Sequence, residues 1–145
     1  MFGNLLGRLT APQPKTLSDE DARLSLSALL VRIARSDGDY AQAEIDQIDR
    51  VLAHRYKLSA FEATELRKQA ESLEAEAPDT VRFTRAIKDA VEYEDRADVI
   101  EALWAVVLAD GERDIAENSI MRMAANFLGV NDRDSAMARQ RVQSK

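Results

Sequence analysis

Cysteine is absent from this chain of 145 residues, and histidine occurs once, at His54. The chain therefore has no disulfide, thiolate metal site or cysteine nucleophile, and the single imidazole disfavours a zinc site of ordinary ligands. Five glycines and three prolines are too few for a turn-rich β architecture. The longest strongly apolar run, near residues 103–109, is far shorter than the roughly 20 residues that cross a bilayer. No secretory signal is evident at the N-terminus, so we expect a cytoplasmic protein.

Acidic residues exceed basic ones, with 26 Asp and Glu against 20 Lys and Arg and a net charge of −6. Such a domain repels phosphate backbones, so nucleic acid is not an expected partner. Apolar residues make up 46% of the chain and charged residues 32%, which is typical of a globular domain. The length suits one domain with a hydrophobic core of its own. Oligomeric state is not encoded in these features.

Residues 1–16 differ from the rest. Phe2, Leu5, Leu6 and Leu9 have the spacing of an amphipathic helical turn, and two prolines follow at Pro12 and Pro14. We interpret this segment as an apolar arm on a Pro-containing linker. The arm is expected either to fold onto its own domain or to contact a membrane or partner protein.

Residues 17–145 are predicted to form an all-α, single-domain bundle of about seven helices. Caps are predicted at Ser18 with Asp21, at Ser59 with Glu62, at Asp79, and at Asn131 with Asp134. Helix ends are predicted at Gly38, Gly111 and Gly129. The apolar positions that recur with helical spacing are Leu26, Leu29, Leu30, Ile33, Ile45, Ile48, Leu52, Phe61, Leu66, Leu73, Phe83, Ile87, Val91, Val99, Leu103, Val106, Val107, Ile120, Met123 and Phe127. Trp104 is also assigned to the core.

An acidic phrase occurs twice in this helical pattern. Asp37-Gly38-Asp39 with Glu44 returns as Asp110-Gly111-Glu112 with Glu117, and both intervals are 73 residues (110 − 37 and 117 − 44). Leu30 then corresponds to Leu103, and Ile33 to Val106. The repeat divides the domain into two halves, about residues 22–76 and 95–145, which are expected to pack as a pseudo-symmetric pair.

The acidic phrase predicts two turns, each between a pair of helices. An aspartate at a helix C-terminus opposes the helix dipole, at a cost of about 0.3–1 kcal/mol when it is exposed. Carboxylates around a tight turn are the ligands that Ca²⁺ or Mg²⁺ prefers, and the loop is not an EF-hand. The candidate metal ligands are Asp37, Asp39, Glu44, Asp110, Glu112 and Glu117. The alternative is that these side chains bond loop amides and cap the next helix, with no cofactor at all.

The phrases Ala34-Arg35-Ser36-Asp37-Gly38-Asp39 and Leu108-Ala109-Asp110-Gly111-Glu112, each followed by its glutamate, resemble the duplicated signature of the TerB-like family. That family is named for a bacterial tellurite-resistance protein, and the resemblance covers about residues 20–143. It implies an all-α, pseudo-symmetric bundle that binds a divalent cation through the shared acids. It also implies a stress-response role, including tellurite resistance, beside a membrane-associated protein partner.

Enzymatic alternatives have little support in the residues. No serine lies in a nucleophile elbow and no glycine-rich loop could bind phosphates. His54 corresponds to Phe127 in the repeat and is expected to be a partly buried helix-end residue. The carboxylates, Glu44 and Glu117 above all, could in principle perform acid–base chemistry. A non-enzymatic module is the prediction.

Two groups of basic residues offer a metal-free alternative. Arg82, Arg85 and Lys88 form a basic strip on one predicted helix, and Arg139, Arg141 and Lys145 give the C-terminal tail a positive end. Such faces are usually solvated surface. They could also dock an acidic partner or an anionic lipid.

Overall fold

The computed structural model describes residues 5–7, 18–36, 40, 42–77, 79–109 and 115–144; the side chains of residues 36, 43, 106–109 and 115–121 are not described. Within these ranges the secondary structure is helical without a strand, which confirms the all-α prediction. After a short helical turn at residues 5–7, the helices are α2 (Asp19–Ser36), α3 (Gln42–Tyr56), α4 (Ala60–Glu76), α5 (Thr80–Ala90), α6 (Tyr93–Ala109), α7 (Ile115–Leu128) and α8 (Asp132–Gln143).

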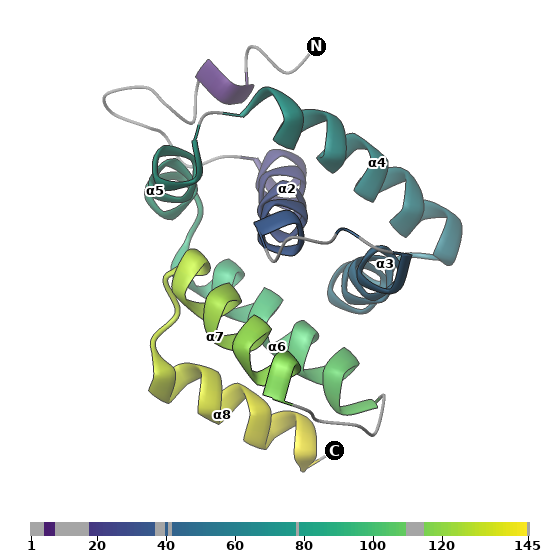
Figure 1. Cartoon of the computed structure of the whole chain (residues 1–145), viewed down its shortest axis with the longest axis vertical. Coiled ribbons are helices and arrows are strands. Elements are labelled where there is room, and N and C mark those ends of the chain that lie inside the picture. The colour runs from purple at the N-terminus through teal and green to yellow at the C-terminus, as the bar shows by residue number, and fades with distance from the viewer. Residues whose placement is uncertain are drawn as a thin grey trace.

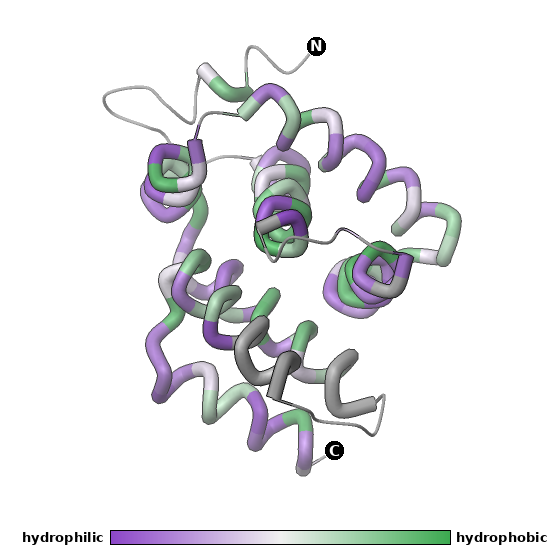
Figure 2. The backbone as a smooth tube through the Cα atoms, in the orientation of Figure 1, coloured by the Kyte–Doolittle hydropathy of each residue, from purple (hydrophilic) through white to green (hydrophobic). Residues whose placement is uncertain are grey.

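Helix α2 is the centre of the bundle. It packs against α3, α4, α5 and α7, and Figure 1 shows it between these helices. Its predicted apolar stripe is buried, and Ala28 and Val31 on its other faces are buried completely. Figure 2 shows a mostly hydrophilic α8 at the outer side of the bundle, whereas hydrophobic residues recur along α2. The core therefore forms around one helix that is enclosed from several sides.

The helix bounds follow the 73-residue interval. Adding 73 to α2 and α3 gives 92–109 and 115–129, each within one residue of α6 and α7. Helix α2 packs against α7 and α3 packs against α6, which are corresponding contacts between the halves. Helices α4 and α8, which pack on α2 and α6 respectively, lie on opposite outer sides in Figure 1. This arrangement has the pairing expected of two copies related by an approximate twofold axis.

The predicted helix caps are confirmed. The Glu62 amide donates to Ser59 Oγ at 3.1 Å, and the Ser59 amide donates to Glu62 Oε1 at 3.0 Å, which is a complete capping box. Asn131 accepts from the Asp134 amide at 2.8 Å, and Asp79 accepts from the Arg82 amide at 3.0 Å. The Asp21 amide donates to Ser18 Oγ at 3.2 Å. Local side-chain chemistry thus starts these helices where the sequence predicts.

Two predicted core positions differ from the structure, and three others have side chains that are not described. Phe61 is 74% exposed, because α4 buries a stripe through Ala63, Ala70 and Leu73 and Phe61 lies off that stripe. Phe127 is half-buried beside α5 rather than enclosed in the core. The side chains of Val106, Val107 and Ile120 are not described, and Gly38 and Gly111 lie outside the described residues.

Arg96 is a buried cation that joins two helix ends. Its Nε donates to the Val91 carbonyl, just after α5, at 3.1 Å, and its Nη1 donates to the Leu128 carbonyl at the end of α7 at 2.7 Å. Helix C-termini carry partial negative charge, so these carbonyls suit a guanidinium that burial has removed from water. Burial also lowers the pKa of Arg96 from its ordinary value. Gly129, with φ of +70°, completes the turn after α7.

We expect Gly129→Ala to destabilise the fold by about 2 kcal/mol, because alanine is strained at this positive φ. Its Cβ would also lie 2.7 Å from Arg96 Nη1 and 2.9 Å from Lys88 Cε. Urea unfolding followed by circular dichroism measures the loss. Gly7→Ala is the matched control, since nothing lies within 4 Å of its added Cβ. A Gly129→Ala variant as stable as the control would contradict this account of the α7 end.

Candidate functional site

Glu44 is the candidate metal ligand whose side chain the structure describes. It lies in the first turn of α3, where a carboxylate is favoured by the helix dipole. The side chain is half-buried and lines an apolar cavity of about 40 Å³ together with Ile33 and Ala34 of α2. Leu30 and its repeat equivalent Leu103 line the same cavity. Glu44 is therefore placed where the end of α2, the start of α3 and the second half of the repeat meet.

The last turn of α2, just before the first acidic turn, is anchored to α4. Arg35, in the last turn of α2, donates from Nη1 to Glu74 Oε2 at 2.5 Å. Glu74 also accepts from Arg32 Nε at 2.7 Å, and Arg32 extends to Thr80 Oγ1 at 3.2 Å. The Glu74 side chain is only 7% exposed, so it is a buried carboxylate held by two guanidinium groups. Such a geometry can offset the desolvation of the charges, and it fixes the end of α2 against α4.

The residue after the turn is anchored to the same helix. Tyr40 donates its hydroxyl hydrogen to Glu71 Oε2 at 2.6 Å, and the Arg35 guanidinium carbon lies 5.1 Å from the centroid of its ring. Burial and the hydrogen bond to Glu71 raise the pKa of Tyr40, which keeps the phenol a donor. Because Glu71 and Glu74 lie three residues apart, one face of α4 holds both flanks of the turn.

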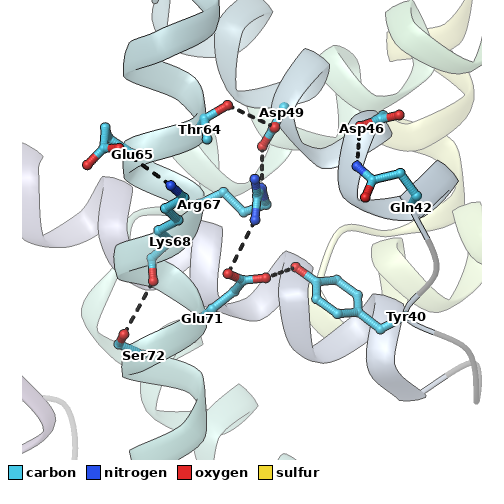
Figure 3. A network of polar contacts seen from close by, with 10 residues as sticks. All are labelled: Tyr40, Gln42, Asp46, Asp49, Thr64, Glu65, Arg67, Lys68, Glu71 and Ser72. Atoms are coloured by element: carbon cyan, nitrogen blue, oxygen red, sulfur yellow. Dashed lines mark hydrogen bonds and ion pairs between the residues drawn. The ribbon is translucent and has the colours of Figure 1, made fainter.

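Glu71 belongs to a network that links α4 to α3 (Figure 3). Arg67 donates to Glu71 Oε1 at 3.2 Å and to Asp49 Oδ1 of α3 at 2.6 Å. Thr64 donates to Asp49 Oδ2 at 3.1 Å. Figure 3 shows these side chains converging between α3 and α4, with Tyr40 entering from the side of the turn. The two helices that flank the first acidic turn are thereby fixed relative to α4.

The comparison with known families agrees with this architecture. The sequence matches the model of the family described as tellurite resistance protein TerB over residues 23–140. The chain belongs to the TerB family. No curated protein and no solved structure matches it significantly. The matched residues extend from the first half of α2 to α8, so the TerB domain includes both acidic turns.

The other candidate ligands of this TerB domain cannot be placed. Asp37, Asp39, Asp110 and Glu112 lie outside the described residues, and Glu117 lies in α7 with a side chain that is not described. Among the residues with described side chains, no cluster of three or more histidine, aspartate and glutamate residues could hold a metal ion. The structure therefore establishes the frame of the first turn, and the ligand set remains a prediction from the sequence.

Two predictions about aromatic and ionisable residues have clear outcomes. His54 is exposed in the last turn of α3, so the expected partial burial is wrong. It projects outward there although its repeat equivalent Phe127 is half-buried. Trp104 is buried as predicted, with Nε1 donating to Ser135 Oγ at 3.1 Å.

Within the described part of the TerB domain, no helix is both long and apolar enough to span a membrane.

Sequence reasoning missed the residues that hold the first turn: Arg35, Tyr40, Glu71 and Glu74. One signal was available, because Tyr40 directly follows the acidic phrase and two glutamates are three residues apart on a predicted helix. The pairing between them crosses more than thirty residues, as Tyr40 to Glu71 illustrates. Helical spacing defines faces within one helix and leaves contacts between helices undetermined.

We expect Glu74→Gln to destabilise the TerB domain by about 3 kcal/mol, because it leaves two guanidinium groups without their shared carboxylate. Glu65→Gln is the matched control on the same helix. Its partner Lys68 lies 3.9 Å away on the surface, so its loss should change stability by less than about 0.5 kcal/mol. Urea unfolding measures both variants. Equal stability of the two would show that the Glu74 cluster does not hold α4 on α2.

Proposed function

We propose that this TerB domain is a non-enzymatic module that binds a divalent cation through its two acidic turns and docks a protein partner in a stress-response pathway. Family membership supports the general assignment. The observation that carries the cation proposal is the double anchoring of the first turn, through Arg35 to Glu74 and through Tyr40 to Glu71. A turn held on both flanks presents its carboxylates with less loss of conformational freedom on binding.

The chemistry of the donors fits a hard cation. Asp37, Asp39 and Glu44 in the first half, and Asp110, Glu112 and Glu117 in the second, offer only carboxylate oxygens. Ca²⁺ and Mg²⁺ take oxygen ligands, whereas the absence of cysteine removes the thiolate donors that select softer metals. Glu44 has in addition an apolar wall formed by Ile33 and Ala34, which limits the water around one side of its carboxylate. A bound cation would bring together carboxylates that otherwise repel one another.

Ca²⁺ or Mg²⁺ at a hundredfold excess over its Kd should stabilise the protein by about 2.7 kcal/mol, which raises the Tm by several degrees. The double variant Asp37→Asn with Asp110→Asn should abolish the shift. A charge-matched control is Glu65→Gln with Asp132→Asn, two exposed acids outside the turns, which should keep it. Differential scanning fluorimetry of chelator-treated protein measures all three.

A Tm shift that survives in the double turn variant would place the cation elsewhere and contradict the proposal. No shift for the wild type across millimolar Ca²⁺ and Mg²⁺ would leave the metal-free alternative, in which the aspartates bond loop amides.

A docking function of the basic strip is the second candidate. Arg82, Arg85 and Lys88 are all exposed on α5, and Arg82 is paired only loosely, at 3.8 Å, with its capping neighbour Asp79. Arg85 and Lys88 line a groove of about 330 Å³ between α5 and α7, with Val81 69% exposed beside them. Basic side chains beside an exposed apolar residue suit an acidic surface, such as a membrane with anionic lipids. The N-terminal arm is less available for this role, because Leu5 is buried in the domain core.

Reversing two charges, Arg85→Glu with Lys88→Glu, should weaken binding to anionic vesicles by at least tenfold, since each basic residue near such a surface contributes about 1 kcal/mol. Co-sedimentation with phosphatidylserine vesicles measures the change. Lys68→Glu with Arg133→Glu is the matched control, because both residues are exposed on other helices. Equal weakening by both pairs would mean that net charge, and not this strip, governs the binding.

A further inference from the structure

A polar pocket lies away from the acidic turns, between the start of α2, the end of α3 and the start of α6. Its volume is about 230 Å³, and the side chains that matter for its chemistry are those of Arg23, Arg55 and Tyr56. Asp19 and Asp95 lie at the same pocket. None of these residues belongs to the repeated acidic phrase, so the pocket is independent of the cation proposal.

Two guanidinium groups share one aromatic ring in this pocket. The Cζ atoms of Arg23 and Arg55 lie 4.7 and 4.9 Å from the centroid of the Tyr56 ring. Cation–π attraction favours each contact singly, but the two like charges repel each other. The Arg55 Nη2 atom lies 3.8 Å from Asp95 and 3.5 Å from Asp98, both longer than a charge-assisted hydrogen bond. The two cations are therefore only partly compensated by the carboxylates around them.

Three donors of this cluster are also buried without a partner. Arg23 Nε, Arg55 Nε and the Tyr56 hydroxyl have no hydrogen-bond acceptor among the described residues. The hydrogen bonds with Ser59, and to a smaller extent the Arg23 charge, lower the pKa of Glu62, and the Glu62 carboxylate is already engaged in the capping box. Buried donors without acceptors are unfavourable, by about 1–3 kcal/mol each. Burial raises the pKa of Tyr56 to about 12, so its phenol remains a donor at neutral pH.

The arginine at the equivalent position of the second half makes different contacts. Arg23 and Arg96 are equivalent across the 73-residue interval, and Arg96 is fully engaged with the carbonyls of Val91 and Leu128. Arg23 makes no such bond to a described carbonyl. The position equivalent to Leu128 is Arg55, so the first half adds a cation where the second half has an apolar residue. One copy of the arginine thus joins helix ends, while the other keeps its donors at a pocket.

We propose that the Arg23–Arg55–Tyr56 pocket binds a small phosphate-bearing ligand, either inorganic phosphate or a small phosphomonoester. The phosphate oxygens would accept hydrogen bonds from the two guanidinium groups and from the Tyr56 hydroxyl, whose side chains line the pocket. Guanidinium groups match phosphate oxygens in geometry as well as in charge. Asp19 and Asp95 can accept a hydrogen bond from a hydroxyl group, either the P–OH that HPO4²⁻ retains or an alcohol on the organic part of a phosphomonoester such as glycerol 3-phosphate.

The test is a titration of the full chain with inorganic phosphate and, separately, with glycerol 3-phosphate, followed by amide NMR spectra in the presence of a chelator. Saturable shifts are expected for the amides of Ala22 and Tyr56. Arg23→Gln should weaken the affinity about tenfold, the effect of losing one charge-assisted hydrogen bond. Tyr56→Phe, which removes a single oxygen and keeps the stacked ring, should weaken it several-fold. Tighter binding of glycerol 3-phosphate would identify a phosphomonoester as the ligand of the pocket. Tighter binding of inorganic phosphate would identify the free phosphate ion.

Arg133→Gln is the matched control, because it removes the same charge from an exposed position on α8, outside both the pocket and the basic strip. Wild-type affinity in this control supports the pocket, and equal weakening by Arg133→Gln and Arg23→Gln would overturn it. The absence of saturable shifts for both ligands would overturn it as well. If Arg23→Gln fails to fold, Tyr56→Phe decides the question, and unchanged affinity there counts against the site. Because chelator is present throughout, failure of the cation proposal would leave these outcomes unaffected.

Discussion

The buried carboxylate of Glu74 is the constraint on which the frame of the first acidic turn depends. A carboxylate removed from water must be compensated, and here Arg32 and Arg35 approach it from α2 at 2.7 and 2.5 Å. Arg32 also reaches Thr80, so the same charge cluster fixes the start of α5. Once α4 is held in this register, Glu71 is one turn before Glu74 and meets Tyr40. The desolvation of one side chain thereby determines where both ends of the turn lie.

The two halves share a frame but not their polar contacts. Helices α6 and α7 repeat the bounds of α2 and α3 within one residue, because buried apolar positions recur with the same interval. The residues that anchor the first turn have no such copy in the sequence, since α8 begins 72 residues after α4 and places Gln143 opposite Glu71, and Tyr40 corresponds to Arg113. The helix bounds therefore recur between the halves, while the tyrosine and glutamate that anchor the first turn do not recur in the sequence. The two acidic turns need not be equal as ligand sites.

The sequence predicts the fold well because its signals are local. Caps at Ser59, Asp79 and Asn131 act over three residues, and the apolar stripe of α2 repeats with helical spacing. Phe61 is an exposed residue that the sequence places in the core, because hydrophobicity alone does not determine which face of α4 packs against the bundle. The candidate site depends on longer-range pairings, such as Arg35 with Glu74, and these arise only when helices are placed in three dimensions. Whether Asp37 and Asp110 coordinate an ion is equally a matter of geometry that no spacing rule supplies.

Arginine has the same structural use in several parts of this acidic domain. Arg32, Arg67 and Arg96 are mostly buried, and each is matched by a carboxylate or by helix-terminal carbonyls. Acidic residues outnumber basic residues by six, so a carboxylate is readily available to pair with a buried arginine in this chain. An arginine pair that is left partly uncompensated is for that reason conspicuous. Arg23 and Arg55 share the ring of Tyr56, and the carboxylates paired with Arg55 lie at 3.5 and 3.8 Å, so an anionic ligand could form shorter bonds to the two guanidinium groups.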